Sequence, residues 1–225
     1  MESALRGMSQ ANMYLGIFQE TKCTDGIYTR ESAGYRVVVT DALRRYRGRV
    51  ALFYRPSPLF EVEAVREYGP NVFNFEVAMG ARRWYIIRCY LAPDDAEMIE
   101  RVVAALEDKP RGTALIVVGD LNTNLGDTEN DRRRSEIAAA MTEAKVEDMT
   151  AHFLRRKQNL GRERQTWSIV REGKVVRSWT EYLLGTGRSI FRNMSVRDPR
   201  HNTNHFVVVG CLRSALAREH FRYIK

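Results

Sequence analysis

The sequence lacks several features that would place it in other functional classes. Its three cysteines, Cys23, Cys89 and Cys211, lie far apart and form no CxxC motif, so the chain offers neither a disulfide framework nor a zinc cluster. No apolar run approaches the roughly 20 residues of a transmembrane helix. The opening stretch MESALRGMSQANMYLGIF holds no continuous apolar segment of a secretion signal. We therefore expect an intracellular protein that does not span a membrane.

Motifs of other large fold classes are also missing. No GxGxxG motif follows a predicted strand, which disfavours a dinucleotide-binding fold. The chain has no internal repeat, no low-complexity tract and no Gly/Ser linker. Its 225 residues, 44% of them hydrophobic, suit one sizeable domain or two small ones. Without a linker, we expect a single domain over residues 1–225.

Basic residues outnumber acidic ones. Lys and Arg together number 36 against 28 Asp and Glu, which gives a net charge of +8 and a pI near 9.6. Such a surplus favours a polyanionic partner, either nucleic acid or a phosphorylated substrate. A soluble basic protein without such a partner is an equally good interpretation of the charge alone.

Hydrophobic periodicity predicts many strands and few helices. Helical spacing covers 94–107 and 131–144, and the tail 212–225 is expected to be helical. The segment 154–164, LRRKQNLGRER, reads as a cationic loop. This pattern indicates an α/β or α+β domain built around stacked sheets. Apolar or alternating runs predict strands at 14–18, 35–40, 50–54, 59–65, 72–78, 84–91, 114–118, 165–170, 175–177, 179–184 and 206–210.

Polar residues with catalytic chemistry lie next to several of these strands. Glu20 follows the first, Tyr90 ends another, and the stretch GDLNTN brings Asp120 and Asn122 directly after the apolar run 114–118. His205 precedes the last strand. The carboxylates of Glu20 and Asp120 suit Mg²⁺, the amide could orient a water or a phosphate, and the imidazole could act as a base. Taken singly, these residues also suit a solvated strand end, a turn and a surface histidine.

The ordered set FQETKC, YLAP, GDLN, Thr166-Trp167, TEYLLGT and TNH resembles the endonuclease/exonuclease/phosphatase family. The likeness is greatest to the apurinic-type endonuclease domains of non-LTR (LINE-like) retrotransposons, and it runs from about residue 13 to the end. It implies an α/β fold, a four-layered α/β sandwich of two packed mixed β-sheets flanked by helices. The implied activity is DNA nicking with Mg²⁺ as cofactor and Mn²⁺ as a substitute. A monomer that acts on DNA, with the nucleus as its compartment, is then expected.

The resemblance also implies a role for each matching residue. Glu20 would be a metal ligand, and Tyr90 would lie close to the phosphate. Asp120 would orient and deprotonate the attacking water, and Asn122 would position the water or the phosphate. His205 would hydrogen-bond the phosphate and stabilise its developing charge.

Further residues are expected to face the nucleic acid. The Arg132–Arg134 triplet and the cationic loop would contact phosphates without reading sequence. For the basic segments, the alternative is simple solvated charge, and for Trp167 it is a core position on a strand. The expected contacts with DNA are Lys22, Arg155, Arg156, Thr166 and Trp167.

Three departures from the family pattern affect this expectation. The family's first strand, with its metal-site Asn, is expected to be missing. Glu181 stands where the family has an Asp that pairs with the histidine, and it adds a methylene. Asn204, at a metal-site position, replaces an Asp and brings no negative charge. Together they predict a weakened nuclease. The alternatives are an inactive nucleic-acid-binding relic and a phosphatase acting on phosphoinositides or sphingolipid products.

Overall fold

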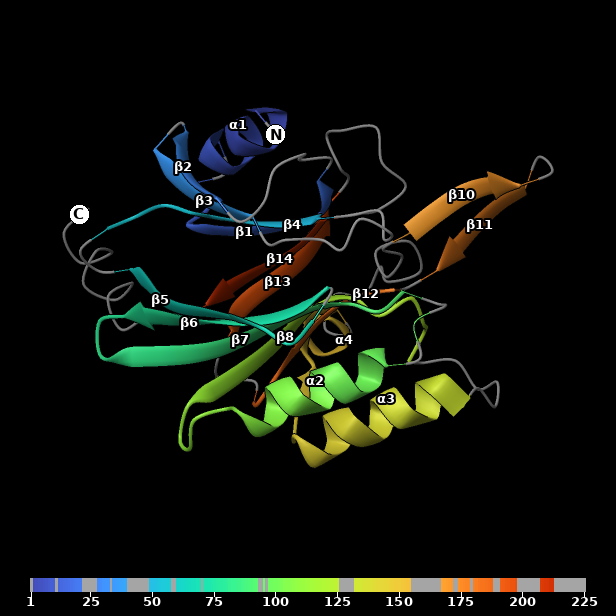
Figure 1. Ribbon diagram of the computed structural model, residues 1–225. Coiled ribbons are helices and arrows are strands. Elements are labelled where there is room, and N and C mark those ends of the chain that lie inside the picture. Colours follow the sequence, from blue (N-terminus) through green and yellow to red (C-terminus); the bar gives the residue numbers. More distant parts are fainter. Residues whose placement is uncertain are drawn as a thin grey trace.

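The computed structural model stacks two main β-sheets between helices (Figure 1). Helix α1 (Glu2–Gln10) covers one outer face, while α2 (Met98–Glu107) and α3 (Arg132–Glu143) cover the other. This is the α/β sandwich that the sequence predicts. The structure describes residues 2–10, 12–21, 28–32, 34–39, 49–57, 60–69, 71–92, 95, 97–125, 132–154, 167–171, 174–178, 180–187, 191–197 and 207–212.

A six-stranded sheet forms the scaffold of the molecule. Its order is β5-β6-β7-β8-β12-β9, and β7 and β8 are its parallel pair. Helix α2 connects these two strands, as a parallel crossover requires. The strands are β5 (Glu61–Glu67), β6 (Val72–Met79), β7 (Arg82–Tyr90), β8 (Ala114–Asp120), β9 (Glu147–Asp148) and β12 (Glu181–Gly185).

The second main sheet has four strands in the order β1-β4-β3-β2, and every pairing is antiparallel. Two further hairpins, β10-β11 and β13-β14, each form a two-stranded sheet, and the short helix α4 (Met149–Leu154) lies near β13. The strands are β1 (Leu15–Thr21), β2 (Tyr28–Ser32), β3 (Tyr35–Val39), β4 (Arg49–Tyr54), β10 (Trp167–Arg171), β11 (Lys174–Ser178), β13 (Phe191–Arg197) and β14 (Val207–Leu212).

Strand alternation divides the six-stranded sheet into two apolar faces. On β7, Tyr85, Ile87 and Cys89 join the core shared with α2 and α3. Trp84 and Ile86 join the core that includes residues of β1 and β4. A third, smaller core joins α1 to β3 and β4. Successive side chains of a strand point to opposite faces, so the near-continuous apolar runs of β7 and β8 are those of strands buried on both sides.

Most predicted strands are confirmed, with shifts at their ends. The main correction is at β8, which continues through Asp120, so this residue ends a strand and does not belong to the following loop. Helix α2 begins at Met98, later than expected. The cationic loop after residue 154 and the tail after residue 212 lie outside the described residues. No helix in the described part of the chain is long and apolar enough to cross a bilayer.

Candidate active site at the end of the six-stranded sheet

Three strands bring the predicted site residues to one edge of the six-stranded sheet. Tyr90, the last residue of β7, is the register partner of Asp120 at the end of β8. On the other side of β8, Glu181 at the start of β12 pairs with the same residue. The backbone continues this pairing, because the Leu91 amide donates to the Asp120 carbonyl at 2.9 Å. Asp120 is therefore held from both sides by regular structure.

Gly119 allows β8 to approach β7 directly before the carboxylate. Its φ is +153°, and a Cβ atom built there would lie 1.7 Å from the carbonyl oxygen of Cys89. No real side chain tolerates that distance, so the glycine of the GDLN motif is a requirement of the backbone. It fixes the position from which Asp120 leaves the sheet.

The turn after β8 orders the next polar residue. Asp120 is 2% exposed, and its Oδ1 accepts a hydrogen bond from the backbone N–H of Asn122 at 2.8 Å. Asn122 adopts a left-handed φ of +47°, which Asn tolerates better than most residues. Its Nδ2 is buried and has no hydrogen-bond partner among the described residues. A buried donor without a partner is costly, and an oxygen of a bound phosphate or water would satisfy it.

A buried cation accompanies the carboxylate. In the described part of the chain, Arg88 and Asp120 are the two buried side chains that carry charge. Burial lowers the pKa of the Arg88 guanidinium, while Cys89, Asp120 and Tyr90 act in the opposite direction. Burial has the opposite effect on the neighbouring thiol and raises the pKa of Cys89 to about 12, so this thiol is protonated and uncharged at neutral pH. The buried negative charge that opposes Arg88 is therefore the carboxylate of Asp120.

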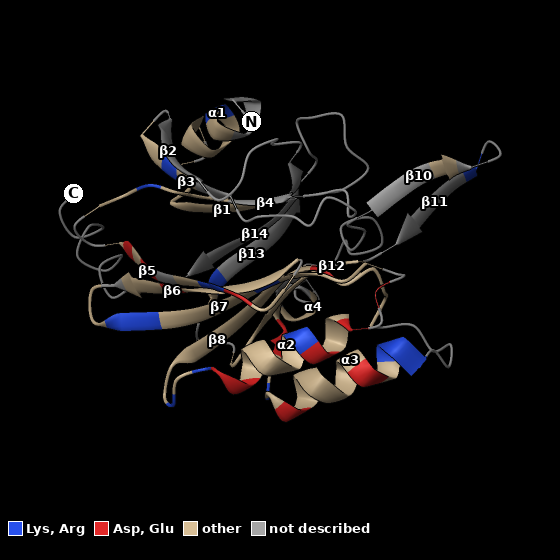
Figure 2. Cartoon of the chain, in the orientation of Figure 1, with Lys and Arg blue, Asp and Glu red and all other residues tan. Residues whose placement is uncertain are grey.

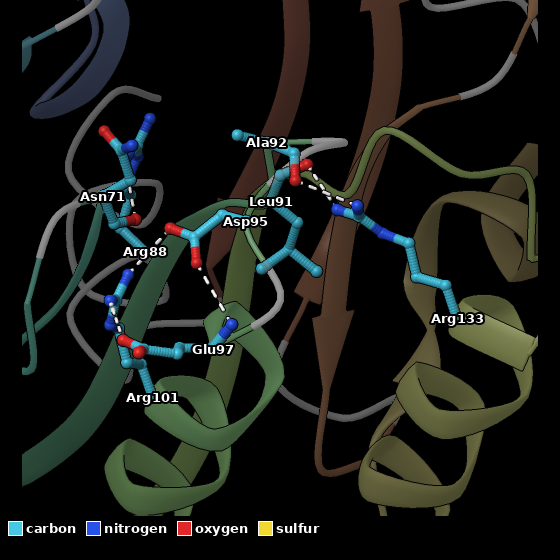
Figure 3. Close-up of polar contacts among 8 residues, drawn as sticks. All are labelled: Asn71, Arg88, Leu91, Ala92, Asp95, Glu97, Arg101 and Arg133. Atoms are coloured by element: carbon cyan, nitrogen blue, oxygen red, sulfur yellow. Dashed lines mark hydrogen bonds and ion pairs between the residues drawn. The ribbon is translucent and has the colours of Figure 1, made fainter. Parts of the chain in front are cut away.

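Helix α3 contacts the segment that follows Tyr90 (Figure 3). The Arg133 guanidinium donates to the carbonyl oxygens of Leu91 at 2.6 Å and Ala92 at 2.9 Å. Nearby, Arg101 of α2 pairs with Asp95 at 2.8 Å. These bonds attach the segment after β7 to two helices.

Two members of the Arg132–Arg134 triplet are placed differently in the structure. Positive charge gathers at the N-terminal end of α3 (Figure 2), as the sequence suggests. Arg133, however, binds backbone carbonyls of its own chain because α3 packs beside the Leu91–Ala92 segment. Arg132 is 92% exposed and pairs with Glu136 at 2.7 Å. Its outward position, unlike that of Arg133, is compatible with a phosphate contact.

Other predicted site residues are described only in part or not at all. Glu20 lies within β1, Trp167 begins β10 and Glu181 begins β12, but the description covers their backbone alone. Within the described residues no cluster of three or more His, Cys, Asp or Glu could hold a metal. Six expected residues lie outside the described ranges: Lys22, Arg155, Arg156, Thr166, Asn204 and His205.

Sequence reasoning did not predict the structural roles of three residues that shape this edge. The backbone of the site is shaped by Gly119 and Arg133, and its charge by Arg88. None of the three stands in a motif that indicates this role. Arg88 does leave a signal, because it is the one charged residue in the apolar run WYIIRCYLA. A charge inside a strand buried on both faces needs compensation. Arg133 leaves no such signal, since it resembles its exposed neighbours.

Comparison with known proteins identifies the family of this chain. The model of the endonuclease/exonuclease/phosphatase family matches residues 5–187. The sequence matches no curated protein.

Solved structures share the fold at low sequence identity. The endonuclease domain of TRAS1, a telomere-specific non-LTR retrotransposon, has a TM-score of 0.73 and 17% identity, covering 95% of this chain and 92% of its own. An endonuclease/exonuclease/phosphatase family protein from Leptotrichia buccalis has a TM-score of 0.68 and 10% identity, with 94% and 91% covered. TDP2 from C. elegans has a TM-score of 0.58 and 12% identity, with 92% of this chain and 67% of TDP2 covered.

Proposed function

Because the chain belongs to the endonuclease/exonuclease/phosphatase family, a family of hydrolases of phosphodiester bonds, we propose that it nicks DNA with the help of a divalent metal ion. The observation that carries the proposal is the buried carboxylate of Asp120 at the joined ends of β7, β8 and β12. A general base must be held in place and reach the proton that it accepts. Strand pairing on both sides of Asp120 meets the first of these requirements.

The side chains around Asp120 support hydrolysis of a phosphate ester. Asp120 would orient the attacking water and accept its proton. The buried Nδ2 of Asn122, which lacks a partner in the described part of the chain, would donate to that water or to a phosphate oxygen. Tyr90, held beside Asp120 by strand register, would contact the phosphate, and His205 would hydrogen-bond it. Water attack in line with the leaving oxygen is the reaction that this set of groups favours.

The donor set at this edge fits a hard divalent cation. Mg²⁺ prefers oxygen ligands and needs only one or two carboxylates beside phosphate oxygens. Asp120 brings a buried carboxylate to this edge, and the Nδ2 donor of Asn122 would face a phosphate oxygen and not the ion. Glu20 and Asn204 would hold the ion. Bound Mg²⁺, or Mn²⁺ in its place, would act as a Lewis acid on the phosphate.

Charge favours DNA over a small phosphorylated substrate. The chain carries a net charge of +8, and Arg132 is exposed at the end of α3 that lies beside the Leu91–Ala92 segment. Lys22, Arg155, Arg156, Thr166 and Trp167 would extend the contact with the duplex. Such contacts to phosphates provide affinity without sequence preference.

We expect the activity to be weakened. Glu181 pairs with Asp120 in the strand register, at a position where the family pattern has a shorter Asp. Asn204 brings an amide in place of a carboxylate. A catalytic group displaced by about 1 Å can reduce the rate on the order of 100-fold, and the loss of a negative charge weakens metal binding.

A plasmid-nicking assay tests the proposal. The purified protein should convert supercoiled plasmid to open circles in Mg²⁺, and EDTA should stop the conversion. An Asp120→Ala variant purified in the same way should be inactive, which excludes a contaminating nuclease. If the parent binds duplex in a salt-dependent manner without nicking it, the protein is a nucleic-acid-binding relic. Release of inorganic phosphate from a phosphoinositide, without nicking, would instead identify a phosphatase.

A further inference from the structure

Arg88 lies next to the candidate active site, and the pairing of its strand does not require an arginine side chain at this position. It belongs to β7, two residues before Tyr90, and its side chain is 1% exposed. A buried guanidinium is expensive because burial removes its hydration. Hydrophobic residues of similar volume often replace buried ion pairs without loss of stability. The cost of Arg88 therefore requires an explanation beyond packing.

The contacts of Arg88 converge on Tyr90. Its Nη1 donates to the carbonyl oxygen of Asn71 at 3.0 Å, as Figure 3 shows. That same carbonyl accepts the backbone amide of Tyr90 at 2.9 Å. The Arg88 Cζ atom also lies 5.9 Å from the centre of the Tyr90 ring and 6.0 Å from that of Phe73. One guanidinium thus contacts the ring of Tyr90 and shares an acceptor with its backbone.

Arg88 and Asp120 are also the two oppositely charged side chains that are buried in the described part of the chain. Asp120 ends β8, and its register partner on the neighbouring parallel strand is Tyr90, two residues after Arg88. Attraction between Arg88 and Asp120 raises the pKa of the guanidinium against the effect of its burial. Charges in an environment of low dielectric interact more strongly than in water, so removing Arg88 alters the field at the carboxylate.

We infer that Arg88 is a positioning residue for the hydrolytic site: its guanidinium fixes Tyr90 against Asn71 and compensates the charge of Asp120. The inference rests on the proposed function. Arg88 acts through Tyr90, which would contact the phosphate, and through Asp120, which would accept the proton from water. Loss of Arg88 should therefore lower kcat more than it raises KM.

Two substitutions separate charge and position from packing. Arg88→Met keeps most of the apolar length and removes the charge and the donors. Arg88→Lys restores the charge but not the planar fork of donors. Arg83→Met is the control on the same strand, because Arg83 lies at the opposite end of β7 from Tyr90 and pairs with Glu63 at 2.9 Å.

Kinetics of plasmid nicking should be measured per folded molecule, with the folded fraction determined by thermal melting. We expect kcat to fall about 10–100-fold in Arg88→Met, as for a displaced catalytic group, with KM within about threefold. Arg88→Lys should recover part of the loss, and Arg83→Met should keep the parent kcat. A folded Arg88→Met protein with the parent kcat overturns the inference. So does an Arg88→Lys protein as slow as Arg88→Met.

A second measurement is independent of activity. In protein labelled with ¹³C-tyrosine, the ring signal of Tyr90 is identified by its loss in Tyr90→Phe. This signal should shift in Arg88→Met and return toward the parent position in Arg88→Lys. If the parent protein does not nick DNA, the proposed function fails while the ring signal still decides whether Arg88 positions Tyr90. Should Arg88→Met not fold, Arg88→Lys and Arg88→Gln are compared, and unchanged kcat and ring signal in both contradict the inference.

Discussion

Two polar clusters on strand β7 differ in what they leave unsatisfied. The tyrosine cluster, in the first half of the strand, consists of Tyr68, Tyr85, Asp108 and Arg66. The Tyr68 hydroxyl donates to Asp108 at 2.8 Å, and the Tyr85 hydroxyl donates to the Ala105 carbonyl at 3.1 Å. The two hydroxyls are 3.0 Å apart, and Arg66 pairs with Asp108 at 2.6 Å. Protein atoms thus supply the hydrogen bonds of both hydroxyls.

The carboxylate cluster, at the end of the same strand, consists of Arg88, Tyr90, Asp120 and Asn122. It contains the two buried charges of the described chain and a buried amide donor without a partner among the described residues. Native structures rarely leave a buried donor unused. Closed networks of the first kind stabilise a fold, and an open network of the second kind is where a ligand can supply the missing contact.

Matched Asp→Asn substitutions at the two clusters give the largest expected contrast. Asp120→Asn should lower the rate of plasmid nicking about 10²–10⁴-fold, the range of general base catalysis. Asp108→Asn should leave the rate at the parent value, because Asp108 serves Tyr68 and Arg66. Nicking rates in Mg²⁺ measure the contrast, with circular dichroism as a check on folding. Equal losses in the two variants would show that the clusters do not differ in function.

Restoring the family's carboxylates should change the carboxylate cluster in the opposite direction. Glu181→Asp would shorten a side chain whose residue is the strand partner of Asp120, and Asn204→Asp would add a charge for the metal. Groups that support a metal site typically matter by about 10–100-fold, so we expect the double variant to nick faster by a factor in this range. The single variants measure the coupling, because effects at one site do not simply add. An unchanged, folded double variant would locate the weakness elsewhere.

The sequence predicts the scaffold of the site better than its interior. The run 114–118 and the helical spacing over 94–107 predict a strand–helix–strand unit, and the structure confirms β7, α2 and β8. The motif GDLN then identifies Asp120 and Asn122 by residue class. Periodicity cannot show that Gly119 faces the Cys89 carbonyl, because that contact depends on the register between two strands.

The arginines illustrate the same limit. Arg132 and Arg133 are neighbours in one basic triplet, yet one pairs with Glu136 in solvent and the other binds two carbonyls across the molecule. Helical geometry separates adjacent side chains by about 100°, so composition treats them alike while packing does not. The role of each arginine depends on whether its side chain faces a packed segment of the chain or the solvent.

Arg133 and Arg132 provide a smaller and more selective contrast. Arg133→Met frees the Leu91 and Ala92 carbonyls and loosens the segment after Tyr90, so we expect kcat to fall about tenfold, less than the full cost of a misplaced group. Arg132→Met should raise KM and reduce the salt dependence of DNA binding by about one phosphate contact. Steady-state kinetics and a salt titration measure both. If Arg133→Met changes only KM, this side chain contacts DNA and does not order the loop.

The smallest effect is expected in the tyrosine cluster, and it is one of stability. Tyr85→Phe removes the hydrogen bond to the Ala105 carbonyl and the hydroxyl contact with Tyr68, and it should lower the free energy of unfolding by about 1 kcal/mol at pH 8. The nicking rate should not change. Urea unfolding at several pH values measures the first effect. Tyr14→Phe, at a position that is 44% exposed, is the control and should leave the unfolding free energy nearly unchanged.

The pH dependence of that difference tests whether the cluster is closed. Burial raises the pKa of Tyr85 above its ordinary value, and the neighbouring Tyr68 and Asp108 add to the effect. A raised pKa means that the folded state favours the neutral phenol. The contribution to stability is then fully present below pH 10, the ordinary tyrosine value, and is lost as pH rises above it. The 1 kcal/mol difference between parent and Tyr85→Phe should therefore shrink between about pH 10 and pH 11. A difference that stays constant would mean that Tyr85 ionises as easily in the fold as in the unfolded chain, and the cluster would then be as open as the one around Asp120.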